Sequence, residues 1–182
     1  TLRTRLRQAT LGMFSVTDEG DVVFKDDCKS SKLDALEDIL SNSIDGEPAL
    51  ILTDSKKFAN VICARIPGAL PWHGDVSQTK REEHKEKFIS GEVKYIVAVI
   101  SAIAEGVDGL QHATRNIVWV SRSDNRILNE QAVKRVHRNG QKQQVQSFDI
   151  VAIDTYDSGV ISDQLKKALE MNRTLKSEQF VG

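Results

Sequence analysis

Short apolar runs alternate with amphipathic segments along most of this 182-residue chain. Four of the runs are mainly apolar and rich in β-branched residues, which predicts strands, the first three of them buried. These runs are Ala49–Thr53, Tyr95–Ser101, Asn116–Ser121 and Val145–Ile153. Strands that alternate with helices favour a parallel sheet covered by helices on both faces. The pattern therefore predicts an α/β domain of three layers.

The segments between the runs have the spacing of helices with one apolar face. The predicted helices are residues 1–12, a helix that starts at Ser30 or Ser31, residues 55–66 with Asp54 as a cap, Gln78–Ser90, Asn129–Arg138 and Ser162–Lys176. Residues 15–31 are instead acidic and rich in turn formers, which indicates a loop or a small hairpin.

Composition is that of an ordinary globular domain, with 40% hydrophobic and 28% charged residues. The net charge of −1 excludes a uniformly basic surface for binding nucleic acid. Any contact with nucleic acid therefore needs local basic patches. Two candidate patches are Arg3, Arg5 and Arg7, and Arg122, Arg126, Lys134, Arg135, Arg138 and Lys142.

Cysteine content and hydropathy indicate the cellular compartment in which we expect the protein. Cys28 and Cys63 lie far apart without CxxC spacing, which indicates neither a zinc site nor a disulfide framework. No apolar run approaches about 18 residues, so we expect no membrane span and no membrane partner. We expect an intracellular protein, cytoplasmic if bacterial or viral and nuclear if eukaryotic. The chain opens at Thr1, and we expect it to be a fragment whose targeting signals lie elsewhere.

The segment Gln131–Gln141, with the sequence QAVKRVHRNGQ, carries the strongest chemical signal. On a helix, Gln131, Arg135 and Arg138 would project from one face, because they stand at positions i, i+4 and i+7. Arginine keeps its charge and presents a planar fork of donors that matches phosphate oxygens. Two forks beside an amide suit a polyphosphate whose charge changes during a reaction. On spacing alone, a solvated helix face with spare arginines is the commoner interpretation.

Polar residues follow two of the predicted strands, and ligands of such sheets collect at the carboxyl ends of strands. Thr53, Ser55 and Lys56 combine two hydroxyls, a helix N-terminus and a lysine, which can hold a backbone phosphate. The simpler alternative for them is an ordinary helix cap. Ser101 and a glycine turn at Gly106 follow another strand and form a candidate phosphate cradle.

The pattern QxxxRxHRxGQ resembles the last helicase motif of the SWI/SNF family of DNA-dependent ATPases, within helicase superfamily 2. Its final Gln141 points to that branch, since related helicases read HRxGR. Gly74, Arg81 and Phe88 keep the two seven-residue intervals of an earlier family segment. Residues 101–110 resemble the fifth motif, in the superfamily form AxGxD rather than the glycine-rich SWI/SNF form. The flanking stretches also resemble the family, so that the resemblance covers nearly the whole chain.

The resemblance implies a RecA-like domain with a mostly parallel central sheet, the second of two lobes between which ATP binds. No P-loop occurs here, since none of the eleven glycines is followed by lysine. ATP with Mg²⁺ would therefore be bound mainly by a missing first lobe. The chain would be part of an ATP hydrolase and inactive alone. Its implied partners are that N-terminal lobe and DNA, contacted mainly through backbone phosphates.

The same resemblance implies a role for each candidate residue. Arg135 and Arg138 would be catalytic arginine fingers, and Gln131, Gly106 and Asp108 would lie at the nucleotide. Asp108 has a plainer alternative as the cap of a short turn. No metal ligands are expected in the chain. The residues expected to contact nucleic acid are Thr53, Ser55, Lys56, His73, Gly74 and Ser101.

The expected division of the chain has three parts. Residues 1–31 would be a lead-in helix and an acidic loop from the first lobe, residues 32–157 the RecA-like helicase domain, and residues 158–182 a brace helix packed on it. Three alternatives stay open: a lobe of another superfamily 2 helicase that acts on RNA, a non-enzymatic nucleic-acid-binding module, and a doubly wound domain for a small ligand.

Overall fold

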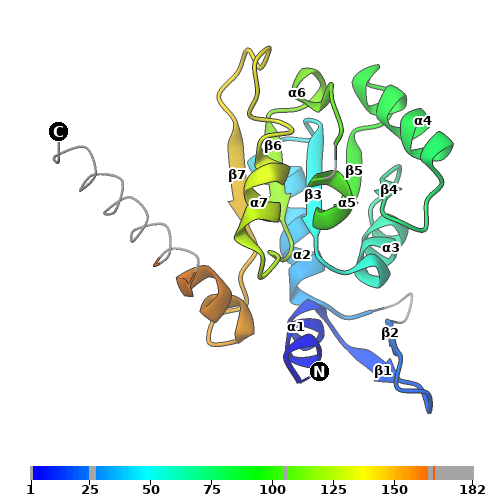
Figure 1. The fold of residues 1–182 in the computed structure, drawn as a ribbon, viewed down its shortest axis with the longest axis vertical. Helices are drawn as coiled ribbons and strands as arrows, with labels where there is room; N and C mark the ends of the chain where they lie inside the picture. The colour runs from blue at the N-terminus through cyan, green and yellow to red at the C-terminus, as the bar shows by residue number, and fades with distance from the viewer. Residues whose placement is uncertain (1, 25–27, 105, 164–165, 167–182) are drawn as a thin grey trace, which may run out of the picture.

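A central parallel sheet of five strands, in the order β4-β5-β3-β6-β7, organises the chain (Figure 1). The structure is a computed structural model and describes residues 2–24, 28–104, 106–163 and 166. The strands are β3 (Ala49–Thr53), β4 (Leu70–Trp72), β5 (Tyr95–Val99), β6 (Asn116–Trp119) and β7 (Gln146–Asp149). In the central register, Ala49 aligns with Tyr95 on one side and with Asn116 on the other. All four strands predicted from the apolar runs are present.

Helices cover both faces of the sheet because the side chains of β3 alternate between two apolar clusters. Ala49 and Ile51 pack with Leu36 of α2 and Ile62 of α3 on one face. The opposite face packs against α4, α5, α6 and α7 (Figure 1). The helix bounds are α2 (Ser31–Asp38), which continues as the π-helical turn η1 (Ile39–Ser43), α3 (Lys56–Arg65), α4 (Gln78–Ile89), α5 (Ile100–Ala104), α6 (Leu110–Ala113) and α7 (Arg126–Val133). The predicted three-layer, RecA-like α/β architecture is confirmed.

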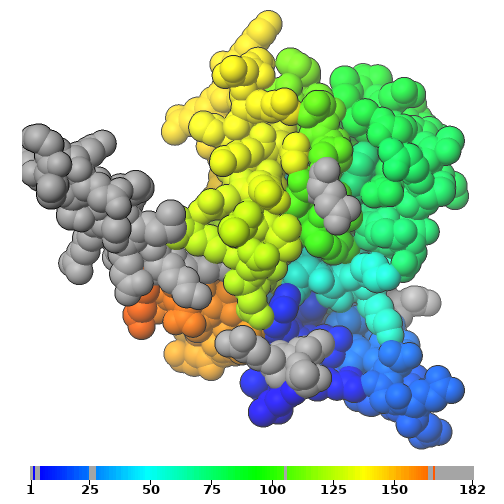
Figure 2. Space-filling view, viewed as in Figure 1, coloured from blue at the N-terminus to red at the C-terminus, as the bar shows by residue number. Residues whose placement is uncertain are grey.

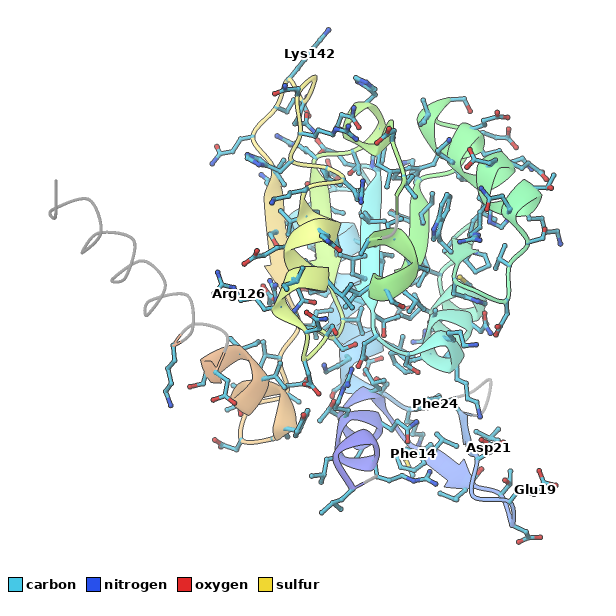
Figure 3. The ribbon with its side chains drawn as sticks, in the orientation of Figure 1. Phe14, Glu19, Asp21, Phe24, Arg126 and Lys142 are labelled. Carbon is cyan, nitrogen blue, oxygen red and sulfur yellow. The ribbon has the colours of Figure 1, made fainter. Side chains whose placement is uncertain are left out.

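The N-terminal segment forms a helix and a small hairpin beside this domain. Helix α1 spans Leu2–Leu11, and β1 (Phe14–Val16) pairs with β2 (Val22–Phe24) in antiparallel register. Phe24 joins the hairpin to the domain, since its ring lies 5.2 Å from that of Phe58 on α3. Glu19 and Asp21 lie at the outer tip of the hairpin, away from the sheet (Figure 3).

The chain after β7 turns into a helix over residues 156–163. The predicted closing helix, Ser162–Lys176, was placed too late, because the helix is already formed at Tyr156. Most of the expected brace segment, residues 158–182, lies outside the described residues. No helix in the described part of the chain is long and apolar enough to cross a membrane.

Two further local predictions were wrong, and one strand was missed. Strand β4 was not predicted, since it has only three residues and contains Pro71. Helix α3 is capped by Ser55, which accepts a hydrogen bond from the backbone N–H of Phe58, and Asp54 is engaged elsewhere. Helix α7 begins at Arg126 rather than Asn129, since Asn125 caps it, and it ends at Val133.

Candidate functional site

The five residues expected at the nucleotide line one open depression. It has a volume of about 950 Å³ and lies between α7 and the loop that follows α5, on the face shown in Figure 2. The side chains and backbone that line it are those of Lys85, Gly106, Asp108, Gln131, Lys134, Arg135, His137, Arg138 and Asn139. The structure thus brings together residues from Lys85 to Asn139, and most of their side chains are cationic or amide groups.

The two arginines line this depression from irregular turns after α7, and not from the helix that was predicted to carry them. Because α7 ends at Val133, Arg135 and Arg138 do not project from one face of a continuous helix. The chain instead runs on in irregular turns, in which the Arg135 N–H bonds to the Ala132 carbonyl at 3.2 Å. Val136, wholly buried, anchors these turns and leaves both arginines on the side of the depression.

The two arginines have different surroundings. Arg135 is partly buried, and its Nη2 donates to the carbonyl oxygen of Ala104 at the end of α5. Arg138 forms an ion pair with Asp108, and both side chains are open to solvent, at 46% and 75% exposure. An exposed ion pair is weak enough to exchange partners. Arg138 can therefore leave Asp108 for another anion, whereas Arg135 ties the segment to α5.

Gly106 contributes backbone rather than a side chain. Its φ of +134° is a conformation that other residues rarely adopt, and no heavy atom lies within 4 Å of where a Cβ would stand. Its backbone is therefore free to approach a bound group.

The residues expected at nucleic acid lie at the carboxyl ends of three neighbouring strands. His73 and Gly74 follow β4, Ser101 follows β5, and Thr53 ends β3. Gly74 and Ser101 are exposed, as is Lys56. The Lys56 ammonium lies 2.8 Å from the Asp75 carboxylate. The accessible part of this edge thus combines a glycine turn, a hydroxyl and one cation.

The other members of the set are engaged within the fold. Thr53 is wholly buried, with its Oγ1 3.1 Å from Oγ of Ser121. His73 is 3% exposed, and its Nε2 lies 2.9 Å from Oδ1 of Asn60. Burial lowers the pKa of the His73 imidazole, and the Asp75 carboxylate opposes that shift. Ser55 caps α3. These side chains shape the loops that present Lys56 and Gly74.

Several members of the two basic patches are neutralised by acidic partners. Arg7 pairs with Asp54, and Arg122 makes two hydrogen bonds to Asp149 at 2.6 and 2.8 Å. Arg126 and Lys142 also lie well apart on the molecule (Figure 3). The second patch is therefore not one continuous basic surface.

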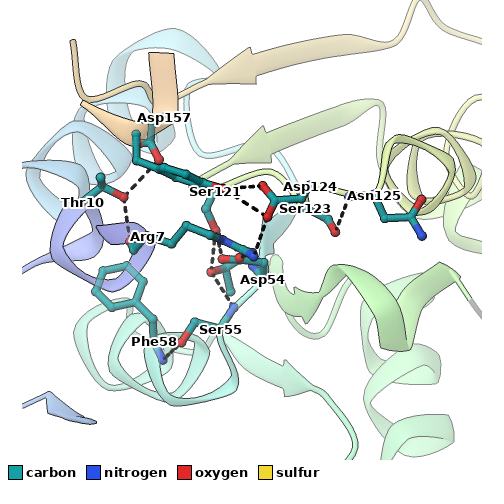
Figure 4. A network of polar contacts seen from close by, with 12 residues as sticks. Arg7, Thr10, Asp54, Ser55, Phe58, Ser121, Ser123, Asp124, Asn125 and Asp157 are labelled. Carbon is teal, nitrogen blue, oxygen red and sulfur yellow. Dashed lines mark hydrogen bonds and ion pairs between the residues drawn. The ribbon is translucent and has the colours of Figure 1, made fainter. Parts of the chain in front are cut away.

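A polar network at the carboxyl ends of β3 and β6 was missed by the sequence analysis (Figure 4). It joins Arg7 and Thr10 of α1 to Asp54, Asp124 and Asp157. No local signal could have found it, because its members come from segments that are far apart in the chain. Among the described residues there is no cluster of three or more His, Cys, Asp or Glu side chains that could hold a metal ion.

Comparison with known proteins places the central part of the chain in a known domain family. The sequence model of the helicase conserved C-terminal domain matches residues 31–140. A DEAD-box ATP-dependent RNA helicase 7 of Spinacia oleracea is 33% identical over 79 residues, which are 43% of this chain and 11% of that protein. The crystal structure of the C-terminal part of the Fun30 ATPase domain superposes with a TM-score of 0.67 at 21% identity, over 74% of this chain and 45% of that one.

The chain therefore spans about a tenth of the RNA helicase and less than half of the Fun30 structure. The likeness to Fun30 shows the fold. The family match covers more than half of the chain and includes the depression and the strand ends described above. The chain belongs to the helicase conserved C-terminal domain family.

Proposed function

We propose that this chain is the second motor lobe of a SWI/SNF-type, ATP-dependent DNA helicase or translocase. The observation that carries the proposal is the convergence of Gln131, Gly106, Asp108, Arg135 and Arg138 on one open depression. In the proposed division, residues 1–31 lead in from the first lobe, residues 32–157 form the motor lobe and residues 158–182 brace it. The protein would act where DNA is kept, in the cytoplasm of a bacterium or the nucleus of a eukaryote.

In this proposal, ATP and its Mg²⁺ are held mainly by the preceding lobe, and this lobe completes the site. Arg138 leaves Asp108 and places its planar fork on the γ-phosphoryl oxygens, where negative charge grows during transfer. Arg135 stays bonded to the Ala104 carbonyl and fixes the direction from which the segment approaches. Gln131 adds an amide, and the backbone at Gly106 lies close to the nucleotide.

The nucleic-acid contacts are to backbone phosphates. Lys56, Gly74 and Ser101 offer a cation, open backbone and a hydroxyl along three adjacent strand ends. The loops that carry these groups are stabilised by the internal hydrogen bonds of Thr53, Ser55 and His73. Contacts of this kind carry little sequence information and weaken steeply as salt rises. Closure and opening of the cleft between the lobes would then move the protein along DNA.

A second candidate function has its own support. The 33% identity to a DEAD-box RNA helicase over 79 residues favours RNA as the nucleic acid. The final Gln141 of the arginine segment favours the SWI/SNF branch and thus DNA.

The deciding experiment measures ATP turnover by the intact protein alone and with single-stranded DNA, duplex DNA or RNA of equal length. Stimulation by DNA but not by RNA supports the proposal, and stimulation by RNA alone replaces it with the second candidate. Turnover that no nucleic acid changes would overturn both. The Arg138→Ala protein is the control that assigns the turnover to this site, and the 182-residue chain alone should hydrolyse no ATP.

A further inference from the structure

The side chain of Gln141 points to a place other than the nucleotide depression. Its Nε2 donates to the carbonyl oxygen of Gln111 at 3.1 Å and to that of Thr114 at 2.9 Å. Gln111 lies in α6, and Thr114 directly follows that helix. One amide group therefore joins the arginine segment to both ends of a short helix from another part of the chain.

Two hydrogen bonds and one glycine hold the turn that carries Gln141. Its N–H bonds to the Arg138 carbonyl at 3.0 Å, and its Oε1 accepts from the N–H of Gln143 at 3.0 Å. Gly140, between them, has a φ of +96°, and a Cβ there would stand 3.0 Å from Cε1 of His112 on α6. The turn therefore packs closely against α6, and these contacts restrict its movement relative to that helix.

Helix α6 begins at Leu110, two residues after Asp108, the partner of Arg138. Gly109, with a φ of +99°, is the N-cap residue of the helix, and its N–H bonds to Oε1 of Gln111 at 3.1 Å. Residues 138–141 therefore contact the chain both before α6 and at its C-terminal end. Arg138 holds Asp108 just before α6, and Gln141 holds the carbonyls within and after it.

We propose that Gln141 is a positioning residue for Arg138. By tying the turn to α6, its amide fixes where the Arg138 guanidinium stands relative to Asp108 and to the nucleotide depression. Gln141 itself is not among the residues that line that depression, so it acts through Arg138 and not on the nucleotide. This inference rests on the proposed role of Arg138 in ATP hydrolysis.

The test replaces Gln141 by methionine, which has a similar length but no donor, and uses Gln144→Met as the matched control at an exposed glutamine. In the intact protein, we expect Gln141→Met to lower kcat for ATP by about 10- to 100-fold, as for a reacting group misplaced by about 1 Å. KM for ATP should change little, because the loss falls on the reacting geometry. In an Arg138→Ala background, Gln141→Met should cause no further loss.

A second readout separates this inference from the proposed function. In the 182-residue chain, ¹⁵N relaxation of the Arg138 Nε–H group should show greater side-chain motion in Gln141→Met and not in Gln144→Met. If Arg138→Ala leaves turnover unchanged, the proposed function fails, and the relaxation result still decides whether Gln141 holds Arg138. Unchanged Arg138 motion in Gln141→Met, or an equal loss of kcat with and without Arg138, would overturn the inference. If Gln141→Met does not fold, Gln141→Glu replaces it, since it keeps the length and the Oε1 acceptor.

Discussion

Arg7, on α1, forms an ion pair with Asp54, the residue that follows β3 (Figure 4). Asp54 also accepts a hydrogen bond from Oγ of Ser121 at 2.6 Å, and Nη1 of Arg7 lies 3.4 Å from the Asp124 carboxylate. The N-terminal helix is therefore fastened across the carboxyl ends of the two central strands. The two side chains of the ion pair are only partly exposed, at 26% for Arg7 and 12% for Asp54.

Arg7→Met should lower the free energy of unfolding by about 1–2 kcal/mol, because Asp54 would lose the cation that compensates its partial burial. Lys94→Met removes an exposed cation and should change stability by less than about 0.5 kcal/mol. Urea denaturation of both variants checks this. Equal losses in the two variants would mean that the Arg7 pair contributes no more than a surface charge.

Asp157→Ala should destabilise the chain by about 3 kcal/mol, because it leaves the buried ammonium of Lys32 without its counter-ion. Lys32 is 2% exposed, and its ammonium also donates to the Val120 carbonyl at 2.6 Å. The double variant Lys32→Met with Asp157→Leu should recover most of that loss, since no charge remains buried. Thr10, which bonds to Asp157 at 3.0 Å, loses its partner in both variants and so does not affect the comparison. Additive losses in the double variant would contradict this account.

The titration of Lys32 should make a measurable contribution to the pH dependence of stability. Burial lowers the pKa of the Lys32 ammonium below 10.5, and Asp157 opposes that shift without cancelling it. Between the lowered pKa and 10.5 the unfolded chain binds more protons than the folded chain, so that stability rises with pH in that window. Relative to Lys32→Met, the wild-type chain should gain stability as the pH approaches 10.5. A difference that stays constant with pH would show that Lys32 titrates as an exposed lysine.

Sequence patterns predicted the three central strands well because these strands are buried on both faces. Ala49 and Ile51 face one cluster and Leu50 and Leu52 the other, so that the first four positions of β3 are all apolar. A run of that kind is visible without knowledge of its partners.

The elements that were wrong depend on contacts that the pattern does not show. The i, i+4, i+7 spacing predicted a helix through Arg138, although the following Asn139-Gly140 pair is a turn signal. The burial of Val136 and the bond from Arg135 to Ala104 give the segment its irregular path. The burial of Lys32 could not be predicted from local sequence, because the residues that bury it lie far along the chain.

Gly140→Ala should destabilise the chain by about 1–2 kcal/mol, since alanine is strained at a φ of +96° and its Cβ would press on His112. Gly159→Ala is the matched control. It lies in a helix with no heavy atom near its Cβ position, so that alanine should stabilise the chain by about 0.5–1 kcal/mol. Thermal unfolding of the two variants gives opposite shifts if this is correct, and a shared sign would contradict it.

In the intact protein, Arg138→Ala should lower the rate of ATP turnover by about 10³- to 10⁵-fold, the usual effect of removing an arginine finger. The loss belongs in kcat, because negative charge grows on the γ-phosphoryl oxygens during the reaction. Stability should hardly change, since the pair with Asp108 is open to solvent.

Arg135→Ala should lower the rate nearly as much and should also reduce the free energy of unfolding by about 1–2 kcal/mol. The extra loss arises because Arg135 is partly buried and bonded to the Ala104 carbonyl. Lysine at either position should rescue poorly, because a point charge cannot reproduce the planar fork. Gln131→Ala should be milder, since a neutral amide offers less to a developing charge. Lys134→Ala, an exposed cation on the same depression, is the control for a general loss of positive charge. If both arginine variants kept the turnover of Lys134→Ala, the arginines would form only a solvated basic surface.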